Sequence, residues 1–163
     1  MADAPSPFLS STWLAAARQV ADDLDAEIAA AGDDVERPGV LTLESPVTID
    51  VTVNEAPDDV DTATGGVVVC HVTADGQRIA VELGHLAAEG GEPEASVTTD
   101  YETAKAMFVS GDPAAFMQKF MGGSILVQGD LPRLIGLFAA MATAAANDPR
   151  AARATNSLRA ITA

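Results

Sequence analysis

The chain has 163 residues, of which 24 are acidic and 9 are basic, so its formal net charge is −15, while 48% of its residues are hydrophobic. That apolar share is too high for a disordered acidic chain and favours one folded, soluble domain. The charge argues against nucleic-acid binding, which needs clustered Lys and Arg, and against anionic membranes. No apolar run approaches the roughly 20 residues of a membrane span, and no export signal is visible.

The first predicted element is an amphipathic helix that begins near Ser10 or Ser11, either of which can cap it, and ends at Gly32. Its apolar residues recur at helical spacing: Trp13, Ala17, Val20, Leu24 and Ile28. The period then changes to two. Val47, Ile49, Val51 and Val53 alternate with polar residues, which predicts a strand with one wet face.

A hairpin is predicted next, with strands at Gly66 to Thr73 and Gln77 to Leu83 around a two-residue turn at Asp75-Gly76. That turn places Val72 opposite Ile79 and Cys70 opposite Val81, with apolar side chains on one face. The other face receives mainly polar residues, His71 and Glu82 among them.

The second half of the chain alternates short strands and helices. Strands are predicted at 94–99 and 124–128; one helix follows its cap Asp100, the next follows Asp112, and a longer helix begins after Gly129-Asp130. This order predicts an α+β fold, a five-stranded, mostly antiparallel sheet with helices covering one face. We divide the chain into an extension (1–9), the domain (10–147) and a basic tail (148–163) that is either mobile or a loosely docked helix.

Few residues favour catalytic or metal chemistry. His71, Glu82 and His85 could approach one another at one side of the sheet, but solvated polar residues explain them better than a metal or acid–base site. The acidic loop with Asp58, Asp59 and Asp61 lacks the pattern of a calcium loop. The single cysteine, Cys70, excludes an internal disulfide and suits a reducing cytoplasm. We expect no metal and no cofactor.

Phenylalanine and methionine gather between residues 107 and 141, which hold four of the five methionines. Core packing explains such a cluster, and so does a deformable apolar pocket, because the flexible thioether adapts to more than one shape.

The segment Thr99 to Lys105, the later Phe120-Met121-Gly122-Gly123, and Gly129-Asp130-Leu131 resemble the C-terminal half of sterol carrier protein 2 (SCP2) domains, closest to small stand-alone prokaryotic ones. Residues 8–14 resemble the opening of that branch. Val68 and Ala104 stand where the family often has tryptophan. The resemblance implies an apolar tunnel between sheet and helices that holds a sterol, a fatty acid or an acyl-CoA.

We therefore predict a cytoplasmic, non-catalytic protein that binds and transfers lipid, with at most transient membrane contact. The predicted cavity residues are Val68, Val81, Phe108, Phe116, Met117, Phe120, Met121, Leu134, Ile135 and Phe138. One alternative is an accessory or assembly partner of an enzyme, with Arg150, Arg153 and Arg159 docking an acidic partner or the protein's own acidic surface. Another is an enzyme that uses Asp100 and Tyr101 as acid and base.

Overall fold

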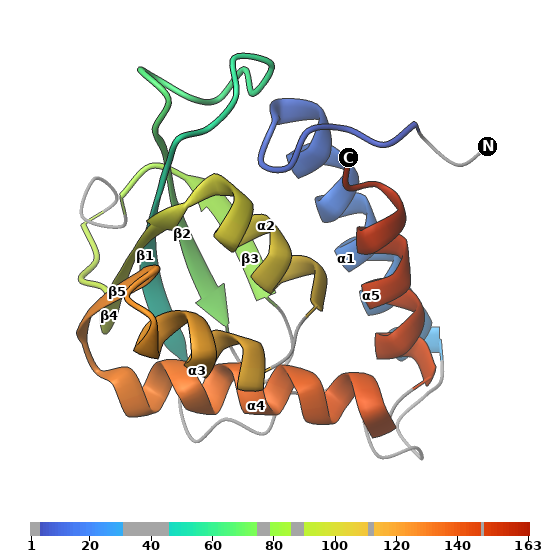
Figure 1. The fold of residues 1–163 in the computed structure, drawn as a ribbon. Helices are drawn as coiled ribbons and strands as arrows, with labels where there is room; N and C mark the ends of the chain where they lie inside the picture. Colours follow the sequence, from blue (N-terminus) through green and yellow to red (C-terminus); the bar gives the residue numbers. More distant parts are fainter. Residues whose placement is uncertain (1–3, 31–45, 75–78, 86–89, 111–112, 148) are drawn as a thin grey trace.

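Five strands form a single sheet in the order β3-β2-β1-β4-β5 (Figure 1). The computed structural model describes residues 4–30, 46–74, 79–85, 90–110, 113–147 and 149–163. All neighbouring strands are antiparallel except β1 and β4, which are parallel. The predicted α+β class is thereby confirmed. The strands are β1 (Val47–Asn54), β2 (Val68–Ala74), β3 (Ile79–Leu83), β4 (Ala95–Asp100) and β5 (Ile125–Gly129).

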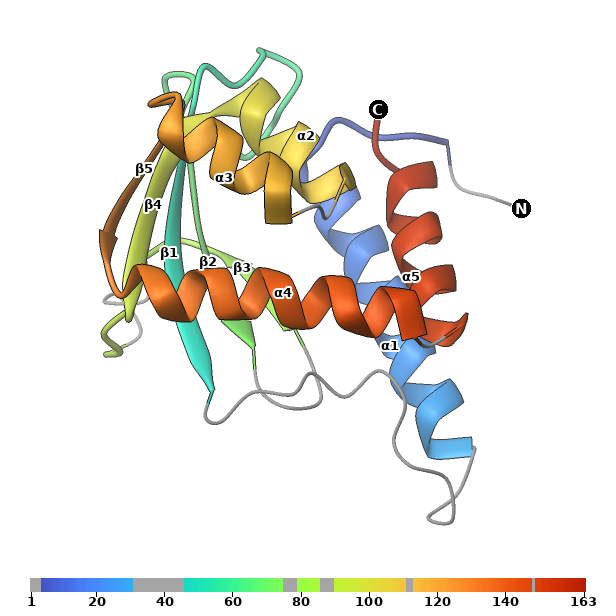
Figure 2. The same cartoon turned by 60° about the horizontal axis from the view of Figure 1, so that its bottom comes forward.

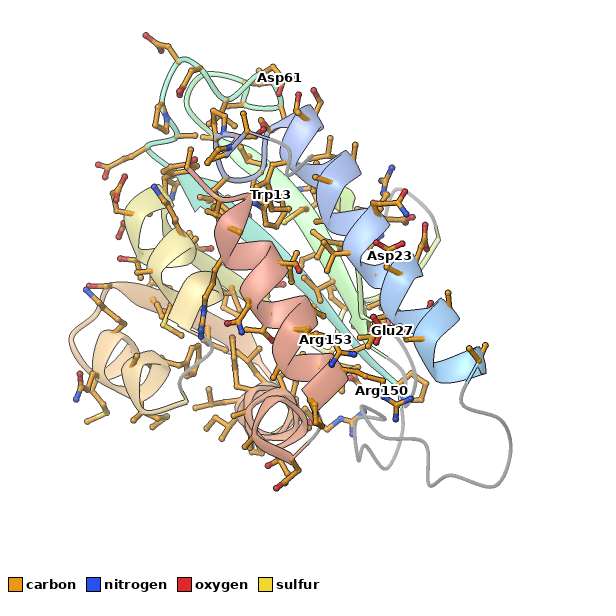
Figure 3. The ribbon with its side chains drawn as sticks, turned by 90° about the vertical axis from the view of Figure 1, so that its right-hand side faces the viewer. Trp13, Asp23, Glu27, Asp61, Arg150 and Arg153 are labelled. Atoms are coloured by element: carbon orange, nitrogen blue, oxygen red, sulfur yellow. The ribbon has the colours of Figure 1, made fainter. Side chains whose placement is uncertain are left out.

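The helices divide into two groups. α2 (Tyr101–Ser110), α3 (Pro113–Met121) and α4 (Leu131–Asn147) lie on one face of the sheet, and α4 runs across it from the β5 side toward α5 (Figure 2). α1 (Ser11–Ala30) and α5 (Pro149–Ala160) pack against each other beside β3 (Figure 3). In the described part of the chain no helix covers the other sheet face, which we call the outer face.

The alternation in β1 places its apolar residues on the helix-covered, inner face. Val47, Ile49 and Val53 are buried there. β2 continues the same face, because Val51 pairs with Cys70 and Val53 with Val68. The period of two read from the sequence therefore gives the correct inner face for β1 and β2.

The predicted hairpin register is wrong by two residues. Val72 pairs with Val81 instead of Ile79, and Cys70 pairs with Leu83 instead of Val81. Ala74 pairs with Ile79, so four residues, 75–78, separate the strands where a two-residue turn was predicted. Because the shift is even, every side chain keeps its predicted face.

The expectation that His71 faces water is also wrong. It lies on the outer face, as predicted, but only 2% of it is exposed, and its strand neighbour Asp50 is only 8% exposed. The connection from β3 to β4 passes beyond β2 and β1, because these strands lie between its ends. Gly84 and His85 of that connection contact the two buried side chains, and their burial follows from this crossing.

Helix starts are capped as the sequence predicts. The Ser10 hydroxyl accepts the Trp13 N–H at 3.2 Å, and Asp100 accepts the Thr103 N–H and hydroxyl, both at 2.8 Å. These two bonds lower the pKa of Asp100 below its usual value. A carboxylate with a lowered folded-state pKa stabilises the fold at neutral pH, and that contribution is lost as the pH falls through the acid range.

The tail forms a docked helix, one of the two alternatives left open. The Trp13 Nε1–H donates to the Thr162 hydroxyl at 2.9 Å. The Ser6 N–H donates to the Ile161 carbonyl at 2.8 Å, and the Ala163 N–H donates to the Ser6 carbonyl at 2.9 Å. Hydrogen bonds thus hold Ser6, near the start of the chain, against the last three residues, 161–163, which follow α5.

Candidate functional site

An apolar layer fills the space between the sheet's inner face and α2, α3 and α4. Its centre is Phe116 of α3, which is 2% exposed. The ring of Phe116 stacks on that of Phe138 with centroids 4.8 Å apart and on that of Phe120 at 6.2 Å. The other buried members come from four strands and two helices: Val47, Ile49, Ala74, Val97, Met107, Ile125, Leu134 and Leu137.

Half of this layer is incompletely buried. Nine further apolar residues pack against the buried ones while retaining some exposed surface: Val51, Ala115, Phe120, Val127, Leu131, Ile135, Phe138, Ala140 and Met141. We call this set of eighteen residues, nine buried and nine partly buried, the apolar layer.

The structure brings five of the ten predicted cavity residues together in the apolar layer: Phe116, Phe120, Leu134, Ile135 and Phe138. Val68 and Val81 belong to a second cluster, described below. Met117 and Met121 lie on the exposed side of α3, with 37% and 79% of their surfaces exposed. Phe108 is part of α2, but its side chain lies outside the described residues.

The second cluster forms where the first residues of the chain meet β1, β2 and the start of α2. Trp13 is completely buried there, and its ring meets the Phe8 ring edge-on with centroids 4.9 Å apart. The Tyr101 hydroxyl donates to the Phe8 carbonyl at 3.0 Å. Sequence reasoning did not assign Phe8 and Leu9 to a core. Two apolar residues directly before a helix cap are a signal that could have done so.

Asp100 and Tyr101, the residues considered for acid–base chemistry, both have structural roles. Asp100 caps α2, and Tyr101 is 4% exposed with its hydroxyl bonded to backbone. Burial raises the pKa of Tyr101, so its phenol stays protonated at neutral pH.

Buried polar groups gather on the outer face instead. His71 Nδ1 lies 2.9 Å from the Gly84 carbonyl oxygen, and since that oxygen can only accept, Nδ1 carries the proton. His71 Nε2 is 3.4 Å from a Glu82 oxygen, and His85 Nδ1 is 3.2 Å from an Asp50 oxygen. Among the described residues, no three His, Cys, Asp or Glu side chains are arranged to hold a metal ion. These contacts hold the β3–β4 connection against the sheet.

One acidic residue of the loop after β1 bonds to the N-terminal end of α1. Asp61 accepts the Ser11 N–H at 2.7 Å and also the Ser11 hydroxyl. These bonds lower the pKa of Asp61 and put a negative charge at the N-terminal end of α1, where the helix dipole favours it.

The basic tail meets the protein's own acidic surface. Arg153 of α5 lies 2.5 Å from a Glu27 oxygen of α1, and Figure 3 shows Arg150 at the same end of this helix pair. The sequence left two targets open for the arginines, an acidic partner and the protein's own acidic surface. In the structure, Arg153 contacts the protein's own surface.

Cys70 is 3% exposed, and burial raises the pKa of its thiol to about 12. We expect Cys70 to react with iodoacetamide at pH 8 far more slowly in the folded protein than in urea, because little thiolate forms. Mass spectrometry of the alkylated chain over time measures both rates. Equal rates under the two conditions would contradict the burial of this thiol.

No helix in the described part of the chain is long and apolar enough to span a membrane.

The sequence matches no family model and no curated protein. Solved structures match the fold. TT1886 of Thermus thermophilus, a conserved hypothetical protein described as a candidate sterol carrier protein, has a TM-score of 0.50 at 14% identity, over 99% of this chain and 94% of that one. The sterol carrier protein domain 2 of Helicoverpa armigera has a TM-score of 0.45 at 18% sequence identity, over 77% of this chain and 87% of that one. Sterol carrier protein 2 of Yarrowia lipolytica has a TM-score of 0.45 at 14% sequence identity, over 86% of this chain and 97% of that one. The chain has an SCP2-like fold.

Proposed function

We propose that this protein binds an apolar lipid, of the sterol, fatty acid or acyl-CoA class, within the apolar layer. The observation that carries the proposal is the incomplete burial of Phe120, Ile135 and Phe138, which pack against the buried members of the apolar layer. Apolar side chains that retain exposed surface around a buried aromatic stack gain free energy when an acyl chain or sterol covers them. The SCP2-like fold is consistent with such a role.

The energetics suffice without a charged clamp. Each methylene group buried contributes about 0.8 kcal/mol, so ten of them supply roughly 8 kcal/mol before ordering costs, which corresponds to micromolar binding. The proposal involves no chemical step on the lipid. A cytoplasmic carrier that releases its lipid unchanged needs only this apolar binding and no catalytic residues.

Docking of an enzyme partner through the tail is the weaker reading. Arg153 is paired with Glu27, and α5 is held at its C-terminal end by Trp13 and Ser6. A partner using this helix would have to compete with these contacts.

Ile135→Trp tests the site directly. Ile135 is a partly buried member of the apolar layer, and the larger indole would occupy space that the ligand needs. We expect the affinity for a fluorescent fatty acid, presented as monomers, to fall about tenfold or more, since losing two methylene contacts already costs about that much. Fluorescence titration gives the dissociation constants.

The matched control is Leu126→Trp, because Leu126 is 62% exposed on β5 and is not part of the apolar layer. It should leave the affinity within about twofold, which is under 0.5 kcal/mol. Circular dichroism checks that both variants fold. Equal affinities for the wild type and Ile135→Trp would refute the proposed site, and so would the absence of uptake by the wild type. Native mass spectrometry of protein purified from its own host then identifies the lipid.

A further inference from the structure

Helix α3 is apolar on two sides. Phe116 and Phe120 face the apolar layer, whereas Met117 and Met121, one turn apart, lie on the side away from the sheet. Met121 is 79% exposed, the largest exposed fraction among the bulky apolar side chains of the described residues. Ala114 and Gln118 complete the exposed stripe, and neither carries a charge. A water-facing helix normally places charged residues there.

The charge of the chain is unevenly divided around this stripe. Residues 1–102 contain 21 of the 24 acids and only three bases, whereas residues 103–163 contain three acids and six bases. No acid occurs between Pro113 and Gly129. α2, α3 and α4 lie on one side of the sheet (Figure 2). Residues 101–147, which include these helices, contain three acids and three bases, so their formal charges cancel.

We propose that the outward stripe of α3, formed by Met117 and Met121, is a docking face for the surface of a lipid bilayer. The two thioethers insert at the level of the headgroups and the neighbouring part of the acyl chains. The segment with most of the acids, residues 1–102, contributes none of the residues of this stripe.

Three observations favour a bilayer over a second copy of the chain or another protein. Two copies at −15 each repel one another, whereas a zwitterionic bilayer has no net charge to oppose the approach. Methionine is flexible, which suits a fluid surface better than one fixed partner. The neighbouring stripe of α3, Phe116 and Phe120, belongs to the apolar layer, so a bilayer at the methionines would lie within one helix diameter, about 10 Å, of the lipid site. This third argument alone rests on the proposed function.

The test is co-flotation with phosphatidylcholine vesicles. We expect the wild type to partition weakly onto vesicles and Met117→Gln/Met121→Gln to lose about tenfold or more of that partitioning, the loss expected from one buried methionine side chain. Leu83→Gln is the matched control, because it removes a 46% exposed apolar side chain from β3, the edge strand at the other end of the sheet from β5. This substitution should change partitioning by less than about twofold. Circular dichroism verifies that each variant folds.

A second measurement does not depend on loss of binding. A polarity-sensitive dye on Met121→Cys should shift to shorter wavelength when vesicles are added, while the same dye on Ala15→Cys, an exposed α1 position, should not; the native Cys70 is buried and stays unlabelled. Absence of wild-type partitioning overturns the docking face, and uptake of monomeric fatty acid in the same preparation shows that the proposed function survives. Equal losses in the stripe and control variants, or a wild-type dimer abolished by the stripe substitutions, also overturn it.

Discussion

Replacing Trp13 by alanine should lower the free energy of unfolding by about 3–5 kcal/mol, the range expected for removing a completely buried tryptophan. Trp13 fills the centre of the second cluster and packs edge-on against Phe8. It also bonds the Thr162 hydroxyl, so its loss frees the C-terminal end of α5 as well as opening a cavity. Urea unfolding followed by circular dichroism measures the change.

Two milder variants separate packing from bonding. Trp13→Phe keeps an aromatic ring but loses the donor. Thr162→Val keeps the shape but loses both the acceptor and the bond that this hydroxyl donates to the Leu158 carbonyl. Each should cost about 1–2 kcal/mol, because one buried partner is left without its hydrogen bond. Hydrogen exchange should show faster opening of 149–163 in both. A loss below about 1 kcal/mol for Trp13→Ala would contradict the complete burial of this side chain.

Gly129→Ala should be the most damaging substitution of a glycine in the described chain, costing about 2–4 kcal/mol. Gly129 has a φ of +99°, which strains any residue with a Cβ. A Cβ there would also lie 2.5 Å from the Glu94 carbonyl oxygen and 3.0 Å from the Ala95 Cα, backbone atoms at the start of the paired strand β4 and just before it. The Asp130 N–H bonds to that same carbonyl at 2.9 Å, so the contact cannot relax without losing a bond at the start of α4.

Gly136→Ala is the natural control. Gly136 is exposed within α4, and nothing lies within 4 Å of the Cβ that alanine would add. Since glycine in a helix interior is less favourable than alanine by about 1 kcal/mol, this variant should stabilise the protein by up to that amount. The midpoint temperature of thermal unfolding should therefore fall for Gly129→Ala and rise for Gly136→Ala. A shared direction would show that the backbone at Gly129 differs from the one described.

The functional reading depends on how the apolar residues of α3 and α4 are distributed. Phe116, Phe120 and Phe138 form a stacked group inside, while the methionines of α3 lie outside. Of the ten predicted cavity residues, five lie in the apolar layer proposed to hold lipid and Met117 and Met121 lie in the outer stripe proposed to meet a bilayer. Val68 and Val81 belong to the second cluster. The two proposals use different sides of one helix and are tested by different substitutions.

Local patterns in the sequence were sufficient for most of the fold. The alternation in 47–53 identified β1 and its inner face, and Asp100 and Ser10 were recognised as caps, because these features depend on residues only a few positions apart. The order of strands and helices then indicated the α+β class. Leu134, Ile135 and Phe138 of α4, which were among the predicted cavity residues, all belong to the apolar layer.

Only the tertiary structure decided the features that depend on contacts between distant segments. His71 and Asp50 are buried because a connection crosses the outer face, and the polar character of these residues gave no sign of it. On α3, the pair Phe116 and Phe120 and the pair Met117 and Met121 form neighbouring stripes about 100° apart around the helix, and either could face a sheet. The packing of α3 onto the strands turned the phenylalanines inward, because that orientation stacks Phe116 on Phe138.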